Sequence, residues 1–130
     1  MIKTLRGIIS IAAVIAVSGC CPVLCFVPHG ESYRKLAFPK PYLEKWEKPG
    51  ASAEDRFQAS EECGGGRSPN SPYFSNSQIE AIRLPGESQN AAYSRRFNEF
   101  ERCMKRQGYK FVGECYDNEI SRSSPACGAP

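Results

Sequence analysis

The sequence predicts a small, mainly α-helical protein in which two helices, at about 53–63 and 89–107, form a disulfide-stapled hairpin with long loops and an extended N-terminal tether. Three observations predict this class: an amphipathic run with clear start and stop signals, a shorter run between a capping serine and a glycine triplet, and seven cysteines in 130 residues. A chain of this length is sufficient for one small domain and too short for two.

The first element is an export signal. Residues 1–6 carry Lys3 and Arg6, residues 7–17 are apolar apart from Ser10, and small residues precede Cys20, which is the secretory pattern. The segment Val17-Ser18-Gly19-Cys20 resembles the lipobox of bacterial lipoproteins. The resemblance implies that the Gly19–Cys20 bond is cleaved and that the Cys20 thiol carries a lipid.

This resemblance also predicts the location. A lipid on Cys20 implies an exported protein held at a membrane by acyl chains. Cys21, standing where an aspartate would retain such a protein, implies the outer membrane and a periplasmic orientation. The alternative is an uncleaved signal anchor, because the apolar stretch continues to Val27 and is long enough to span a bilayer. Pro22 and the Ser-Gly pair weigh against that alternative.

The charge balance excludes one class of partner. Residues 1–19 hold two bases and no acid, so their removal from a chain with 17 bases and 14 acids leaves 15 bases against 14 acids. A nucleic-acid partner is not expected, because nucleic-acid binding needs a dense basic surface.

The cysteines predict a disulfide framework. If Cys20 takes the lipid, an even set of six remains: Cys21, Cys25, Cys63, Cys103, Cys115 and Cys127. Such a set in an exported protein indicates disulfides, and six cysteines allow 15 connectivities, among which spacing does not choose. A metal site is not expected, because Cys21 and Cys25 are the only close pair and His29, the single histidine, lies near the anchor. No cofactor is expected.

The remaining elements follow in order. Several prolines favour an extended lipidated tether over 20–41. A small helical domain is expected over 42–112, with its first helix between a Ser52/Asp55 capping box and the stop at Gly64-Gly65-Gly66. Residues 64–88, rich in Gly, Ser, Asn and Pro, are expected to be a loop insertion.

The second helix is the clearest local prediction. Ser88 can cap it and Gly108 can end it. Its aromatic and apolar residues recur on one face, as is typical of a helix packed on a small core: Tyr93, Phe97, Phe100 and Met104. A short strand is expected at 109–112, and the cysteine-containing tail, 113–130, shows no periodicity.

A second resemblance concerns the middle of the chain. Trp46-Glu47-Lys48-Pro49-Gly50, Cys63 and Cys103-Met104-x3-Gly108-Tyr109 resemble a pattern of small uncharacterised bacterial lipoproteins. The resemblance implies a lipid-anchored helical pair bridged by Cys63 and Cys103. Cys115–Cys127 would then close the tail, and Cys21 and Cys25 would pair with each other or with partners. The visible core is too small to hold such a domain without a staple: Phe57, Tyr93, Phe97, Phe100, Met104 and Val112.

No catalytic residue is expected, and the protein is not expected to be an enzyme. His29 lies in the tether, Glu61 and Glu62 should diverge as neighbours on a helix, and Gly64–Arg67 lacks the Lys-Ser/Thr of a phosphate loop. We therefore expect a lipid-anchored envelope protein that binds or scaffolds an envelope protein or peptidoglycan. The alternative is an inhibitor or phage-receptor exclusion factor that acts through residues 64–88.

Overall fold

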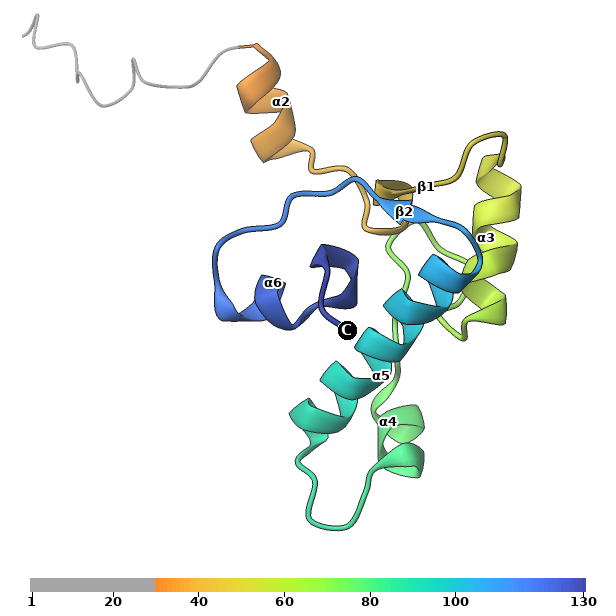
Figure 1. Ribbon diagram of the computed structural model, residues 1–130, viewed down its shortest axis with the longest axis vertical. Coiled ribbons are helices and arrows are strands. Elements are labelled where there is room, and N and C mark those ends of the chain that lie inside the picture. Colours follow the sequence, from red (N-terminus) through yellow and green to blue (C-terminus); the bar gives the residue numbers. More distant parts are fainter. Residues whose placement is uncertain (1–29) are drawn as a thin grey trace, which may run out of the picture. The chain divides into compact units, whose positions relative to one another are not determined.

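The structure, a computed structural model, describes residues 30–130 (Figure 1). The chain divides into two units, residues 1–39 and 40–130. The described part of the first unit holds α2 (Glu31–Ala37), whose residues are all exposed. The prediction of an extended tether is therefore wrong over these residues. The prolines flank this stretch at Pro28 and Pro39 and none lies inside it, so none blocks one short helix.

The second unit is built mainly of helices, and the helices make up about half of the described residues. Its elements follow in the order η2 (Leu43–Lys45), β1 (Trp46–Glu47), α3 (Ala53–Glu62), α4 (Asn76–Ile82), α5 (Gln89–Arg106), β2 (Lys110–Phe111), α6 (Glu119–Ser123) and η3 (Pro125–Cys127). The two predicted helices are α3 and α5. They do not form a simple hairpin, because α4 lies between them.

Local signals set both ends of α5. The Ala91 N–H donates to Ser88 Oγ at its start. At its end Gly108 adopts φ +87°, and the N–H groups of Gly108 and Tyr109 donate to the carbonyls of Lys105 and Met104. This Schellman arrangement satisfies carbonyls that the helix leaves free, and it turns the buried Tyr109 ring back toward the core.

Helix α3 likewise begins with a side-chain cap and ends at a glycine with positive φ. Ser52 and Asp55 exchange hydrogen bonds in a complete capping box. Gly64, at φ +74°, ends the helix, and the Gly65 N–H donates to the Ser60 carbonyl. Packing also requires a glycine at position 65, because a Cβ there would lie 2.2 Å from the Phe100 ring.

The short strands join distant parts of the second unit. β1 and β2 pair antiparallel, with Trp46 opposite Phe111 and Glu47 opposite Lys110. The expected strand at 109–112 is thus confirmed as β2, and its partner directly follows η2. This ribbon carries the buried Trp46 ring into the core, in contact with the Phe111 ring at a centroid distance of 5.3 Å.

The core is larger than the sequence predicted. Its buried hydrophobic residues are Leu43, Trp46, Ala59, Cys63, Phe74, Ile79, Ala92, Phe100, Met104 and Tyr109. Of the expected core, Phe100 and Met104 are buried and Phe57 and Phe97 are half-buried. Tyr93 and Val112 are exposed, so their assignment to the core is wrong.

Residues 64–88 are not a loop throughout. Ser75 caps the start of α4 and forms a capping box with Gln78. Phe74 and Ile79 insert into the core and are 5% and 1% exposed. The polar composition of the segment concealed Phe74, and α4 packs against α5.

Two disulfides close the second unit. Cys63–Cys103 joins the end of α3 to α5, with a Cα–Cα distance of 5.6 Å, and Cys115–Cys127 closes the tail. These are the two pairs that the sequence analysis expected. The tail is also more regular than expected, because α6 and η3 lie within it; Asn118 caps α6 by accepting the Ser121 N–H.

Candidate binding pocket

A pocket of about 440 Å³ lies between α5, β2 and the carboxyl-terminal tail. We call it the α5–tail pocket. Its apolar walls are Tyr42, Tyr93, Phe97, Phe111, Ile120 and Ala126. The tail returns along α5 (Figure 1) and places η3 against that helix, so the tail forms one side of the pocket.

The aromatic walls pack on one another. The Tyr42 ring lies 5.3 Å from the Phe97 ring and 5.7 Å from the Phe111 ring, between centroids. The Tyr93 ring stacks on Phe97 at 6.3 Å. Three separate segments thus contribute one aromatic surface, which fixes the ring orientations around the pocket.

Glu101 lies among the pocket-lining residues and is only 2% exposed. Its carboxylate accepts three hydrogen bonds: from Tyr42 Oη to Oε1 at 2.5 Å, and from Ser124 Oγ and the Ala126 N–H to Oε2 at 2.7 and 3.0 Å. These donors come from the segment before η2 and from the tail. Glu101 therefore ties both ends of the second unit to α5.

Among the residues that the structure describes, the buried carboxylate has no cationic partner. None of the ion pairs among residues 30–130 includes Glu101. Lys105, one turn along α5, donates instead to the Pro125 carbonyl at 3.0 Å. The three hydrogen bonds are what compensates the removal of this carboxylate from water.

The Tyr42 hydroxyl is a permanent hydrogen-bond donor to Glu101. Burial raises the pKa of Tyr42 well above its ordinary value, and the hydrogen bond to Glu101 and the charge of Glu101 raise it further. Tyr42 therefore keeps its proton across the physiological range and donates a hydrogen bond to Glu101. The phenol thus has a fixed role as a donor, which holds one carboxylate oxygen beside the aromatic walls.

The pocket is acidic. Its charged lining residues are Glu101 and Glu114, and no Lys or Arg of residues 30–130 lines it. Glu114 is exposed and accepts a hydrogen bond from the Tyr116 hydroxyl. A ligand in this pocket would meet aromatic faces and two carboxylates.

The residues singled out by the sequence fall into two groups. Gly19, Cys20, Cys21, Cys25 and His29 lie outside the described residues. The four other cysteines form the two disulfides. Cys127 alone among them lines the pocket.

The sequence analysis did not single out Glu101, because it selected the core positions of this helix by apolar residue type. One signal was available: position 101 lies four residues after Phe97 and three before Met104, and this spacing places it on the apolar face. Tyr42 carried no signal, because its partner is 59 residues away in the chain.

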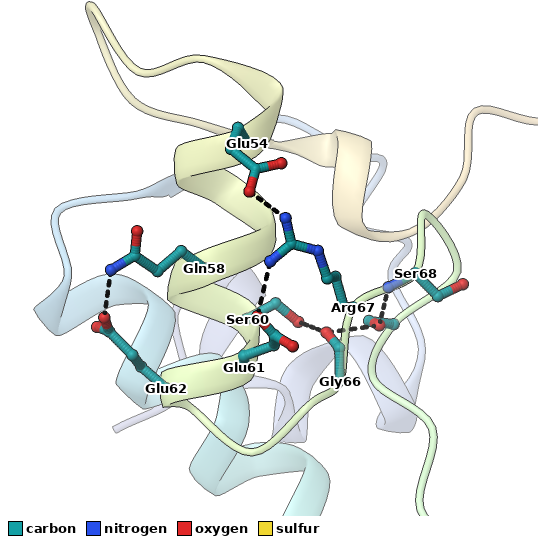
Figure 2. Close-up of polar contacts among 9 residues, drawn as sticks. Glu54, Gln58, Ser60, Glu61, Glu62, Gly66, Arg67 and Ser68 are labelled. Carbon is teal, nitrogen blue, oxygen red and sulfur yellow. Dashed lines mark hydrogen bonds and ion pairs between the residues drawn. The ribbon is translucent and has the colours of Figure 1, made fainter.

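Figure 2 shows the polar contacts around Glu61, Glu62 and the glycine-rich turn, which the sequence analysis considered as candidate sites. Glu61 and Glu62 diverge: Glu61 accepts from Arg67 at 3.0 Å, and Glu62 accepts from Gln58 at 3.0 Å. Arg67 also pairs with Glu54. The Gly66 carbonyl accepts from Ser60 Oγ at 2.7 Å. The glycine-rich turn is therefore held closed by its own polar contacts.

The Trp46–Gly50 segment, which carries the second sequence resemblance, makes stabilising contacts with the end of α5. Lys48 Nζ donates to the Gln107 carbonyl at the end of α5, at 3.0 Å, and lies 5.5 Å from the centre of the Tyr109 ring. A cation at this end of a helix is stabilising. Trp46 is fully buried. The Trp46–Gly50 segment thus docks on the segment around Gly108.

Within residues 30–130, no helix is long and apolar enough to cross a membrane. The same residues contain no cluster of three or more His, Cys, Asp or Glu side chains placed to hold a metal ion. No family model, curated protein or solved structure matches this chain.

Proposed function

We propose that this chain is an exported, lipid-anchored protein of the bacterial cell envelope, and that residues 40–130 bind another envelope component through the α5–tail pocket. The export signal and the Val17–Cys20 segment support the anchor. The disulfides Cys63–Cys103 and Cys115–Cys127 are consistent with export, because such bonds persist in oxidising compartments.

The α5–tail pocket is the observation that carries the binding proposal. Ligand sites are mostly apolar concavities with a few placed polar groups, and this pocket combines aromatic walls with the Glu101 carboxylate. Ile120 lines it and is 81% exposed. This exposed apolar side chain is available to contact a bound partner at the edge of the pocket.

The anchor is tested by metabolic labelling with a palmitate analogue. Cys20→Ala should abolish the label and leave residues 1–19 attached, whereas the matched control Cys21→Ala should be labelled and cleaved normally. Equal labelling of Cys20→Ala and the wild type would overturn the lipid anchor. Retention of residues 1–19 in the wild type would favour the signal-anchor alternative.

The binding proposal is tested by crosslinking in intact envelopes followed by mass spectrometry. Ile120→Asp should lose the crosslinked partner because it removes an exposed apolar contact at the edge of the pocket. The matched control is Leu84→Asp, at another exposed apolar side chain, and it should retain the partner. Retention of the partner by Ile120→Asp would contradict binding at this pocket.

The inhibitor alternative has an observation of its own. Tyr73 and Leu84, within residues 64–88, expose their side chains. Deletion of this segment does not test it, because the deletion also removes the buried Phe74 and Ile79. Loss of the partner in Leu84→Asp, with retention in Ile120→Asp, would instead favour action through 64–88.

A further inference from the structure

We infer that the group that enters the α5–tail pocket is an organic cation: a protonated amine carried on an aliphatic or aromatic body of small-molecule size. The inference rests on the proposed function in one respect, that binding occurs at this pocket. It adds the chemical class of the ligand. Three observations carry it: the charge of the lining, the acceptor capacity left on Glu101, and the aromatic walls.

The charge of the pocket selects for a cation. Both charged lining residues, Glu101 and Glu114, are acids, and no basic residue of the described part of the chain lines the pocket. Glu101 makes no ion pair with any of the described residues, although it is 2% exposed. A carboxylate in such surroundings interacts more strongly with a nearby charge than it would in water. An anionic ligand would be repelled by the same two groups.

Glu101 retains room for one more donor. Its Oε2 accepts from both Ser124 and the Ala126 N–H, whereas within residues 30–130 its Oε1 accepts from Tyr42 alone. A carboxylate oxygen has two lone-pair positions, so Oε1 has one position for which the described residues provide no donor. An ammonium group carries three donors and suits a site that offers this position and the exposed Glu114 carboxylate.

The aromatic walls suit both parts of such a ligand. The rings of Tyr42, Tyr93 and Phe97 form a continuous surface. Ring faces attract cations, and the same faces remove an apolar body from water. The volume of about 440 Å³ lies within the range that is typical of small-molecule sites.

The test uses the full chain purified from membranes in a non-ionic detergent. Three probes share one body and differ in charge: 4-phenylbutylamine, 4-phenylbutanol and 4-phenylbutyrate. Ligand-observed NMR titration at pH 7 should give an affinity for the amine at least about tenfold above that for the alcohol, with the carboxylate weakest. Equal affinities for the amine and the alcohol, or no binding of any probe, would overturn the inference.

Two variants test the residues. Glu101→Gln keeps the shape of the side chain and should abolish the preference for the amine while the alcohol still binds. Glu99→Gln removes the same charge from the exposed side of α5, where it pairs with Arg95 and Arg96, and should keep the preference. Survival of the preference in Glu101→Gln would overturn the role of Glu101.

Glu114→Gln provides a second test in case Glu101→Gln does not fold. Glu114 is exposed and outside the core, so Glu114→Gln should fold and should lower the preference at least about threefold. An unchanged preference in Glu114→Gln, when Glu101→Gln does not fold, would overturn the inference. Failure of these titrations leaves the palmitate labelling and the Ile120→Asp crosslinking results unaffected, so the ligand class and the proposed function fail separately.

Discussion

Removal of the Cys63–Cys103 disulfide should destabilise the protein more than removal of Cys115–Cys127. The sequence separations are 40 and 12 residues. In the chain-entropy description, a crosslink stabilises by restricting the unfolded chain, and these loops correspond to about 4 and about 3 kcal/mol. A domain of this kind has a total stability of about 5–15 kcal/mol, so loss of the longer loop should remove a large part of it. Cys63 is also buried, and its replacement removes core contacts.

The comparison uses paired variants, so that no lone thiol is left to exchange: Cys63→Ala with Cys103→Ala, and Cys115→Ala with Cys127→Ala. Urea unfolding followed by far-ultraviolet circular dichroism, without reductant, gives the free energy of unfolding of each. The first pair should lose at least about 1 kcal/mol more than the second. An equal or larger loss in the second pair would refute the loop-length reasoning. It would indicate that the tail stabilises the protein chiefly through its contacts with Glu101.

Three further outcomes are expected. Gly65→Ala should lower the free energy of unfolding by about 1–3 kcal/mol, because its Cβ would overlap the Phe100 ring; urea unfolding measures the loss. Ser75→Ala should cost about 1 kcal/mol through loss of the α4 cap, seen as faster exchange of the Ile79 amide hydrogen. The hydrogen bonds from Arg95 lower the pKa of Glu87 from its ordinary value of 4.5 to about 2. Their stabilisation is therefore present above about pH 4.5 and is lost as the pH falls through about 2. Glu87→Gln should have a melting temperature that depends less on pH across this window.

The sequence predicted those parts of the fold whose determinants are local. Helix α5 needs only its apolar spacing, Ser88 and Gly108 to define it, and α3 needs Ser52, Asp55 and the glycines that follow. Each of these signals acts within one or two turns of the chain. Their positions can therefore be read without knowledge of the tertiary contacts.

Helix α4 was missed although it carries the same kind of signal. Ser75-Asn76-Ser77-Gln78 is a capping-box sequence, but α4 is a short helix in a stretch rich in residues typical of loops. Only Ile79 is buried within it. A single apolar residue gives no periodicity, and tertiary packing against α5 therefore stabilises this helix more than its sequence does.

The pocket could not be predicted from local sequence patterns. Tyr42, Glu101 and Ser124 are far apart in the chain and meet only after the tail has docked on α5. A glutamate is expected on the surface by its hydropathy, and the burial of Glu101 can be recognised only when its hydrogen-bond donors are known. The same reason explains why Trp46 and Leu43, in a segment too short for periodicity, were not assigned to the core.

The connectivity of the disulfides has a consequence for biosynthesis. Among the four cysteines of the described residues, each bond joins neighbours in sequence order: Cys63 with Cys103, and Cys115 with Cys127. An oxidant that joins these thiols in the order of their synthesis would reach this pairing directly, with no later exchange between the two bonds. In that order, the first bond would fix α3 to α5 before the second closed the tail. Ser124 and Ala126 would then donate to a Glu101 side chain on a helix already held by a disulfide.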